Sequence, residues 1–242
     1  MPDAHYDDPR LAALYDLANG WSEDSDYYLA LAGTTPCRVL DIGCGTGIIT
    51  DAIAARGHVV VGADPSPGML AVARTKSNAD SIRWIESDAQ SLDLGETFDL
   101  IILTGHAFQA LVEDADIQAA AAAMKRHLAQ GGRVVFESRN PVIDWPARWA
   151  LAGKLDTPQG VVRITREYLG STDDCMTFDL RYVFSDSLEL VSHSKLRFAD
   201  LETINALFRA SGLVPEKVCG EWDGSLFDPA SSPEMIFHFQ HA

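Results

Sequence analysis

Three glycines at alternate positions, Gly43, Gly45 and Gly47, have a spacing that indicates ligand binding. They follow the apolar pair at 39 and 40, typical of the end of a buried strand, and precede apolar residues at helical spacing between 48 and 53. Glycine at a strand-to-helix turn permits positive φ and lets a ligand approach bare main chain. The helix that follows offers unpaired N–H groups and the positive end of its dipole. The turn is therefore expected to bind a nucleotide-like ligand with an anionic group.

A carboxylate further along the chain favours this hypothesis over a simple tight turn. A second apolar strand, residues 58–63, ends at Asp64. In doubly wound nucleotide folds an acidic residue about 20 positions past the glycines holds the ribose, because a carboxylate accepts two hydrogen bonds from a vicinal diol. The dinucleotide fingerprint would need glycine where this chain has Ile48, and the Walker pattern would need a lysine after Gly47.

The segment from Val39 to Gly47 resembles, residue for residue, the first motif of class I S-adenosylmethionine-dependent methyltransferases. The resemblance continues through Asp64, the pair Asp88–Ala89 and the strand near residue 100, and it covers roughly residues 36–140. It implies S-adenosylmethionine as cofactor and S-adenosylhomocysteine as product. The cofactor-binding residues that it implies are Asp41, Gly43, Cys44, Gly45, Thr46, Gly47, Asp64, Pro65, Met69, Asp88, Ala89, Thr104 and Gly105.

The same resemblance assigns roles to the adenosine side of this set. The loop after Asp64 would cover the ribose, with Met69 near the adenine face. The Asp88 side chain would accept a hydrogen bond from the adenine amino group, and the Ala89 N–H would bind a ring nitrogen. A side-chain acceptor beside a backbone donor is what an adenine edge requires.

Candidates for the acceptor side follow two later strands. The segment 104–109 comes after the apolar run 98–103, and ligands in open parallel sheets lie beyond the carboxyl ends of the strands. His106, with an unperturbed pKa of about 6.5, is there the candidate general base, or else a histidine that shapes the pocket. Arg139, after the fifth strand, would bind a substrate carboxylate or phosphate, or pair with an acidic neighbour.

Aromatic residues supply the remaining substrate candidates, Tyr15, Tyr27 and Trp145. The two tyrosines lie in predicted helices over 8–18 and 25–32. These helices either pack on the main domain or form a lid over cofactor and substrate, as N-terminal helical segments do in the resembling family. Trp145 either packs beneath a later insertion or stacks on substrate.

The order of elements predicts an α/β fold and fits the sheet of the resembling family, which implies a doubly wound, Rossmann-like, seven-stranded, mostly parallel sheet with an antiparallel last strand. Strict alternation over 175–184, with strands expected at 161–169 and 188–198, predicts a three-stranded antiparallel insertion after the fifth strand. A helix over 113–129 is expected to stop at Gly131–Gly132, before a fifth strand at 133–137.

We expect a single domain with four parts: an N-terminal helical lid (1–35), a cofactor-binding core (36–140), the insertion (150–199), and a C-terminal helix with the last two strands (200–242).

The amino-acid composition limits the classes of partner that the protein is expected to bind. The 19 Lys and Arg against 35 Asp and Glu give a net charge of −16, which disfavours nucleic acid and anionic membranes. No apolar run approaches the length of a membrane span. The four cysteines lack metal-site spacing, so we expect reduced thiols, no metal and a cytoplasmic location.

These observations together predict methyl transfer from S-adenosylmethionine to a small-molecule N or O acceptor by direct in-line displacement. The motif that follows the fourth strand in nucleic-acid amino methyltransferases is absent here, where the chain reads Thr104-Gly105-His106-Ala107. Two alternatives remain open: a non-catalytic S-adenosylmethionine-binding or regulatory protein, and a different nucleotide-cofactor enzyme on a Rossmann-like fold.

Overall fold

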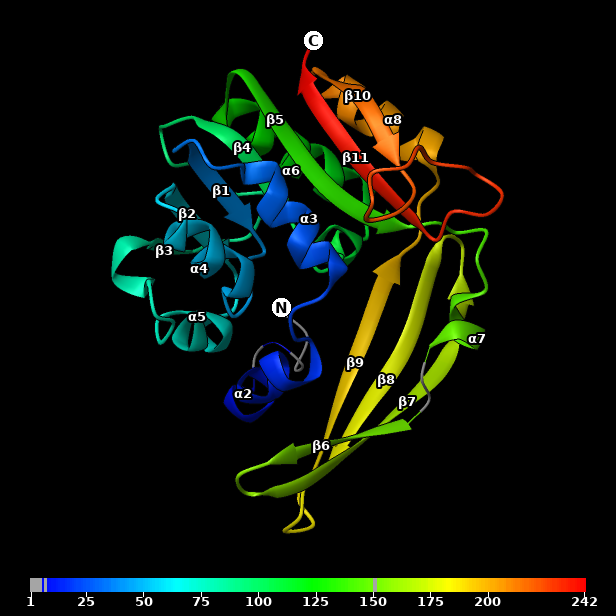
Figure 1. Ribbon diagram of the computed structural model, residues 1–242. Helices are drawn as coiled ribbons and strands as arrows, with labels where there is room; N and C mark the ends of the chain where they lie inside the picture. Colours follow the sequence, from blue (N-terminus) through cyan, green and yellow to red (C-terminus); the bar gives the residue numbers. More distant parts are fainter. Residues whose placement is uncertain (1–5, 7, 150–151) are drawn as a thin grey trace.

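The computed structural model describes residues 6, 8–149 and 152–242, which build a seven-stranded sheet and a separate four-stranded antiparallel sheet (Figure 1). The order in the large sheet is β10-β11-β5-β4-β1-β2-β3. The last strand of the chain, β11, is antiparallel to both of its neighbours, whereas the pairs from β5 to β3 are parallel. The predicted seven-stranded sheet with an antiparallel last strand is confirmed.

The two sheets contain these strands: β1 Arg38–Ile42, β2 Val59–Asp64, β3 Arg83–Glu86, β4 Phe98–Leu103, β5 Leu128–Arg139, β10 Leu213–Cys219 and β11 Glu234–His241 in the large sheet, and β6 Ala152–Thr157, β7 Gly160–Thr172, β8 Cys175–Val183 and β9 Glu189–Arg197 in the small one. The helices are α2 Pro9–Ala18, α3 Glu23–Ala32, α4 Ile48–Ala55, α5 Pro67–Ala73, α6 Asp114–His127, α7 Trp145–Arg148 and α8 Leu201–Ala210, with short 3₁₀ turns η1 Ala79–Ser81 and η2 Ala107–Ala110.

Helices cover both faces of the large sheet, which explains why its central strands are continuous apolar runs. Helices α3 and α4 pack on one face, where Tyr28 and Ile53 are fully buried. Helices α6 and α8 pack on the other face through residues such as Ile117 and Ile204. The carboxyl ends of β1, β4 and β5 are left at one edge of this layered body.

A stack of aromatic rings fixes the segment that follows β4. Phe108 in η2 stacks on Phe136 of β5 with ring centroids 4.4 Å apart, and Phe136 stacks on Phe208 of α8 and Phe237 of β11 at 4.9 and 5.1 Å. Phe239 completes the stack on Phe208 at 4.4 Å. Buried offset rings of this kind contribute packing beyond their area alone. The loop between β4 and η2 is therefore held at a defined height above the sheet.

The insertion has four strands, so the prediction of three was wrong. The additional strand, β6, pairs antiparallel with β7 from Ala152↔Thr165 to Thr157↔Gly160. Most of its residues are exposed, and Leu155 is its one large apolar side chain. An edge strand of this composition lacks the apolar alternation by which strands are detected in a sequence.

The end of α6 also differs from the expectation. The helix ends at His127, and Gly131–Gly132 lie within β5. The C-cap is Leu128, whose N–H binds the carbonyl of Lys125. The side chain of His127 holds the end of the helix, because its Nδ1 binds the carbonyl of Ala123 at 2.7 Å and its Nε2 accepts the N–H of Leu94 at 2.8 Å. The glycines instead accommodate an irregularity where β5 begins to pair with β4.

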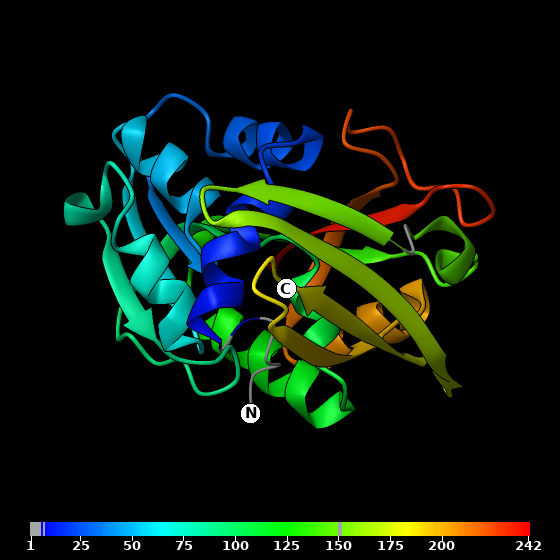
Figure 2. The same ribbon diagram turned by 90° about the horizontal axis from the view of Figure 1, so that it is seen from below.

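Helix α2 joins the two sheets. Its Leu11 and Leu14 are buried against Val162, Phe178 and Leu180 of the insertion. Figures 1 and 2 both place α2 alongside the small sheet and next to the core. The N-terminal segment therefore bridges the insertion and the core, although residues 1–5 and 7 of the predicted lid lie outside the described residues.

The longest helix, α6, has 14 residues. Within residues 6, 8–149 and 152–242, no helix combines the length and the apolar character needed to cross a bilayer.

Replacing Gly47 by alanine tests the packing of the glycine turn. Gly47 has φ +76°, and a Cβ there would come within 2.6 Å of the Trp84 ring. Gly57, with φ +86° and open space around it, is the matched control because its alanine variant carries only the backbone cost of about 1–2 kcal/mol. We expect Gly47→Ala to lower the free energy of unfolding by about 1–3 kcal/mol more than Gly57→Ala in urea titrations. Equal losses would contradict this packing role.

Candidate functional site

The glycine turn between β1 and α4 has the strained geometry that its sequence predicts. Gly43, Gly45 and Gly47 adopt φ values of +69°, +55° and +76°, which only glycine adopts at little cost. The N–H groups of Gly43 and Cys44 bind the carbonyl of Ala63 at 2.7 and 3.1 Å, which ties the turn to β2. A Cβ on Gly45 would meet no atom within 4 Å. The open side of the turn thus offers bare main chain to a ligand.

Asp64, at the end of β2, faces this turn. Its Oδ2 accepts the N–H of Gly45 at 2.8 Å and its Oδ1 accepts the N–H of Ser66 at 2.8 Å. Burial raises the pKa of Asp64. The hydrogen bonds from the two backbone N–H groups lower it by less, so the net shift is upward. Each carboxylate oxygen retains a further lone pair, so the side chain fits a ribose diol at the turn.

Asp41 lies behind the turn rather than in it. Its Oδ2 accepts a hydrogen bond of 2.6 Å from Thr50, which joins β1 to α4. Burial raises the pKa of Asp41 to about 7, and its Oδ1 has no hydrogen-bond partner among the described residues.

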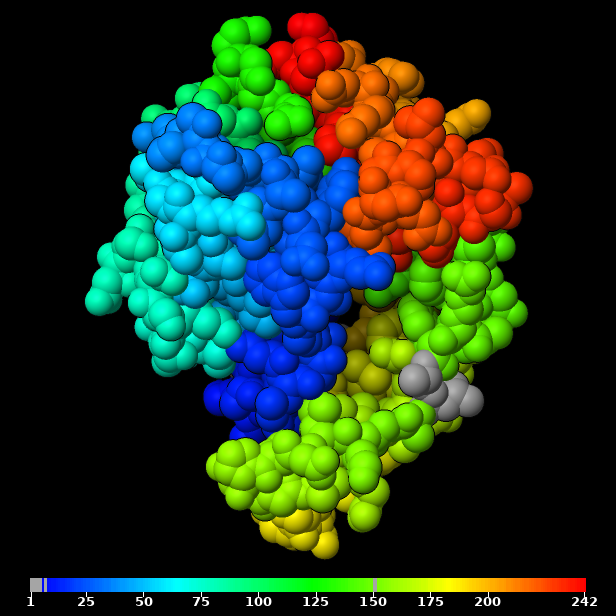
Figure 3. All heavy atoms as spheres, in the orientation of Figure 1, coloured from blue at the N-terminus to red at the C-terminus, as the bar shows by residue number. Residues whose placement is uncertain are grey.

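A cavity of about 510 Å³ opens where the glycine turn meets the loop after β4. Figure 3 shows a hollow between the N-terminal helices (blue) and the segment after β5 (green), with insertion strands (yellow) visible within it. The sequence-predicted residues that line the cavity are Tyr15, Gly43, Cys44, Gly45, Thr46, Thr104, Gly105, His106 and Arg139. The turn, the post-β4 loop and α2 therefore surround one space.

Other predicted residues do not line this cavity: Asp41, Gly47, Asp64, Pro65, Met69, Asp88, Ala89, Tyr27 and Trp145. Met69 is buried within the fold at 1% exposure. Asp88 is exposed, and its Oδ1 accepts the N–H of Ser91 at 2.8 Å. Tyr27 makes a 2.7 Å hydrogen bond to Nε2 of His238 on β11.

His106 is held in an unusual conformation where the loop after β4 lines the cavity. Its φ of +60° is left-handed, which a non-glycine residue adopts only where its surroundings enforce it. Its backbone N–H donates to Glu137 Oε1 at 2.5 Å, and its Nε2 lies 2.9 Å from Glu234 Oε2. The other ring nitrogen, Nδ1, lies 3.9 Å from Glu137 Oε1. Two strands, β5 and β11, thus fix the ring.

Burial controls the charges around His106. It lowers the pKa of the imidazole to about 3, assisted by the positive charge of Arg139. It raises the pKa of Glu234 to about 7 and also raises that of Glu137, whose Oε2 accepts the Tyr28 hydroxyl hydrogen. The imidazole is therefore neutral at pH 7, and Glu234 changes its charge near that pH.

Sequence reasoning missed Tyr28, Glu137 and Glu234. Glu137 could have been predicted as a site residue, because it is a carboxylate inside an apolar strand at the ligand end of the sheet. Glu234 had none, because only the antiparallel pairing of β11 with β5, Glu234↔Arg139, brings it to the site. Tyr28 is adjacent to the predicted Tyr27, and the helix turns it inward, where it is fully buried.

Arg139 lies in an alternating stack of guanidinium groups and aromatic rings. Its guanidinium carbon is 5.5 Å from the ring centre of Trp145 and 5.8 Å from that of Trp149. The guanidinium carbon of Arg166 on β7 lies 5.0 Å from the ring centre of Trp149, on which Arg139 also packs, and 5.6 Å from that of Phe178. The stack joins the core to the insertion, and each cation over a ring contributes about 0.5–2 kcal/mol.

Among the described residues, no carboxylate lies within ion-pair distance of Arg139, so the pairing with an acidic neighbour is not found. Its side chain instead donates to the Oε1 of Gln109 at 2.9 Å. The guanidinium remains charged in the wall of the cavity, although burial lowers its pKa.

Polar contacts hold α2 across the cavity. Asp16 accepts a hydrogen bond from the Thr46 hydroxyl of the glycine turn and forms an ion pair with Lys76. Ser66 donates to the carbonyl of Tyr6 at 2.6 Å. Tyr15 lines the cavity, and burial raises its pKa to about 12.

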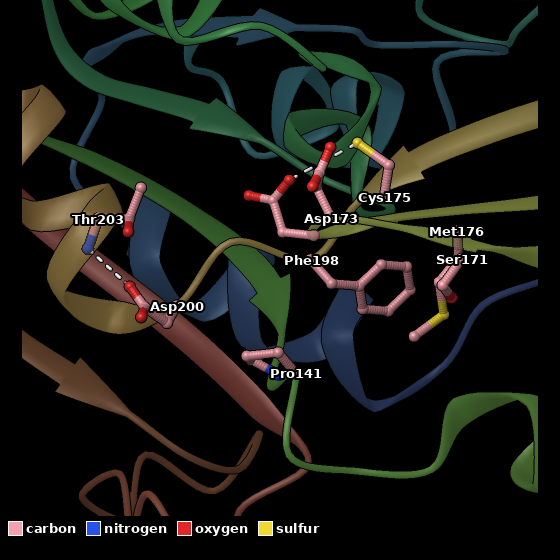
Figure 4. A pocket seen from close by; sticks show the side chains of 9 residues that line it. Pro141, Ser171, Asp173, Cys175, Met176, Phe198, Asp200 and Thr203 are labelled. Carbon is pink, nitrogen blue, oxygen red and sulfur yellow. Dashed lines mark hydrogen bonds between the residues drawn. The ribbon is translucent and has the colours of Figure 1, made fainter.

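A second cavity of about 420 Å³ lies where the insertion joins the core, lined by residues that include Pro141, Cys175 and Phe198 (Figure 4). Its polar groups bind one another or cap a helix. Asp174 pairs with Arg197 at 2.7 Å, and Asp200 accepts the N–H of Thr203 at 2.8 Å at the start of α8. Among the described residues, those that line this cavity include none of the glycine turn or of the loop after β4.

Comparison with known proteins defines the class of this fold and site. Residues 39–132 match the model of a family described as a methyltransferase domain. The cypemycin N-terminal methyltransferase of a Streptomyces species is 26% identical over 201 residues, 82% of this chain and 80% of that protein. A ubiquinone biosynthesis O-methyltransferase from Rhizobium johnstonii is 39% identical over 97 residues, 38% of each chain.

A solved structure agrees over nearly the whole chain. The S-adenosylmethionine-bound amino pentose methyltransferase from Micromonospora echinaspora, involved in calicheamicin biosynthesis, superposes with a TM-score of 0.69. It is 26% identical, and the alignment covers 95% of both chains. Together these similarities support a class I S-adenosylmethionine-dependent methyltransferase. It is a methyltransferase, and its cofactor is S-adenosylmethionine.

Two substitutions test the residues expected to hold the cofactor. We expect Asp64→Ala and Gly45→Val each to weaken S-adenosylmethionine binding at least about tenfold in isothermal titration, since the first removes an ionised acceptor and the second fills the open side of the turn. Asp93→Ala, which removes an exposed carboxylate elsewhere, should bind as the wild type does. Unchanged affinity in both site variants would refute the assignment.

Proposed function

We propose that the chain transfers the methyl group of S-adenosylmethionine to a nitrogen or oxygen atom of a small molecule. The observation that carries this proposal is the cavity in which the glycine turn, the His106 loop and Arg139 meet under α2. Its volume of about 510 Å³ is in the range of pockets for cofactors and small ligands. The net charge of −16 disfavours a nucleic-acid acceptor.

The cofactor supplies a methyl group already activated on a sulfonium. The task of this chain is to place the acceptor in line with that group, and positioning can provide about 7–11 kcal/mol of the barrier reduction. Gly45 and Asp64 would hold the adenosine side, and Thr104 and Gly105 would lie beside the methionine part. His106, neutral and fixed by two strands, would take a proton from the acceptor.

The names of the relatives are consistent with an acceptor of this kind. One relative is named a cypemycin N-terminal methyltransferase, one a ubiquinone biosynthesis O-methyltransferase, and the solved structure an amino pentose methyltransferase. They support a small or exposed acceptor group without selecting its identity.

Turnover is tested by incubating the purified protein with S-adenosylmethionine and a panel of amines, phenols and alcohols while measuring S-adenosylhomocysteine. For any acceptor that reacts, we expect His106→Ala to lower kcat by about 10²–10⁴-fold and to leave cofactor affinity nearly intact. His193→Ala, an exposed histidine on β9, is the control. Normal turnover by His106→Ala over roughly pH 6–9 would exclude His106 from the mechanism.

We also propose that residues 8–32 act as a lid over the site. Asp16 is the contact that would keep it closed, because it joins α2 to both the glycine turn and Lys76. Leu11 and Leu14 would keep the helix attached to the insertion while that contact opens.

The lid is tested by the rate of cofactor release. We expect Asp16→Ala to accelerate dissociation of S-adenosylmethionine about three- to tenfold in stopped-flow displacement, the effect of losing one partly exposed ion pair and its hydrogen bond. Glu23→Ala, an exposed carboxylate in the first turn of α3, should release the cofactor at the wild-type rate. Identical rates for Asp16→Ala and wild type would argue against a lid held by Asp16.

A further inference from the structure

We infer that the acceptor is an amine, bound as its ammonium ion, and that the buried pair of His106 and Glu234 removes its proton. This inference rests on the proposed methyl transfer and specifies the chemical class of its acceptor. It assigns Glu234 as the positioning residue that receives the proton through the ring of His106.

The geometry leaves one ring nitrogen of His106 available to an acceptor. Nε2 is occupied by Glu234 Oε2 at 2.9 Å, whereas Nδ1 makes no hydrogen bond to any described residue. The nearest carboxylate to Nδ1, Glu137 Oε1, lies 3.9 Å away and already accepts the His106 backbone N–H. His106 lines the cavity and the Glu234 side chain lies behind it, only 10% exposed.

The charges around His106 favour a cation over an anion. Three carboxylates surround it, from Glu137 on β5, Glu234 on β11 and Asp24 on α3, against the single guanidinium of Arg139. Two phenols also face the cluster, Tyr28 of α3 and Tyr15 of α2, and both are neutral because burial raises the pKa of each. Because interactions at a buried site are weakly screened, this set stabilises an ammonium ion and destabilises a phenolate or carboxylate acceptor.

The proton and electron pairs can be followed through the step. With Glu234 ionised, Nε2 of His106 carries the ring hydrogen and Nδ1 is a free base. The ammonium group gives a proton to Nδ1, and Nε2–H passes to Glu234 Oε2, so the imidazole stays neutral. The amine nitrogen then bonds the methyl carbon while the carbon–sulfur bond breaks, and the bond pair remains on sulfur as a thioether.

A comparison of two cofactor analogues tests this charge preference without a known acceptor. Sinefungin carries an ammonium-bearing carbon where S-adenosylhomocysteine has a neutral thioether, and the two molecules are otherwise closely matched. Burial raises the pKa of Glu234 to about 7, so its negative charge appears as pH rises through 7, while an alkyl ammonium stays protonated. We expect the preference for sinefungin over S-adenosylhomocysteine to rise roughly tenfold between about pH 6 and 8.

Two variants identify the group responsible. In Glu234→Gln the preference for sinefungin should be smaller and independent of pH, whereas Glu216→Gln, an exposed carboxylate on β10, should follow the wild type. A wild-type preference that does not change with pH, or one that survives in Glu234→Gln, would overturn the inference while leaving the cofactor site intact. Failure of either analogue to bind would instead overturn the proposed function.

Acceptor screening gives an independent result. With matched primary amines, phenols and carboxylic acids, we expect S-adenosylhomocysteine to form with the amines, and its rate to rise with pH near 7 in wild type but not in Glu234→Gln. Turnover confined to phenols or carboxylic acids would contradict an amine acceptor. If no compound in the panel reacts, the sinefungin comparison decides the question.

Discussion

The carboxylate of Glu137 joins three parts of the molecule. It lies near the carboxyl end of β5, accepts the backbone N–H of His106 from the loop after β4, and accepts the hydroxyl hydrogen of Tyr28 from α3. A fully buried carboxylate is tolerated only when its oxygens are satisfied in this way, and removing one partner of such a group costs several kcal/mol. The left-handed conformation of His106 persists because this acceptor stands beneath it.

The cofactor half of the site could be predicted from the sequence because it is built from local chemistry. Gly43 and Gly45 need positive φ, and Asp64 ends the strand beside them, so a short stretch of residues and one strand end specify the turn. The seven-stranded sheet with its antiparallel last strand could be expected because the order of strands and helices fits the sheet of the resembling family. The fourth strand of the insertion was missed because an exposed edge strand has no apolar pattern to detect.

The acceptor half could be predicted only in part, because long-range pairing assembles it. His106 and Arg139 were identifiable as polar residues following buried strands. Glu234, almost a hundred residues beyond Arg139, comes opposite it only through the antiparallel register of β11. Burial then shifts the pKa of Glu234 and of His106 in opposite directions, which no inspection of residue types would show.

This division has a physical consequence for how such an enzyme selects its acceptor. The glycine turn binds a ligand whose chemistry is constant, so it can be rigid and local. The acceptor side combines a charged cluster in the core with the stack of Arg139, Trp149 and Arg166 that leads into the insertion. The insertion reaches the wall of the cavity through Arg139 and through α2, which packs on it by Leu11 and Leu14. In the proposed reaction, the core would therefore set the charge at the transfer point, and the insertion would act on the shape of the cavity through these two contacts.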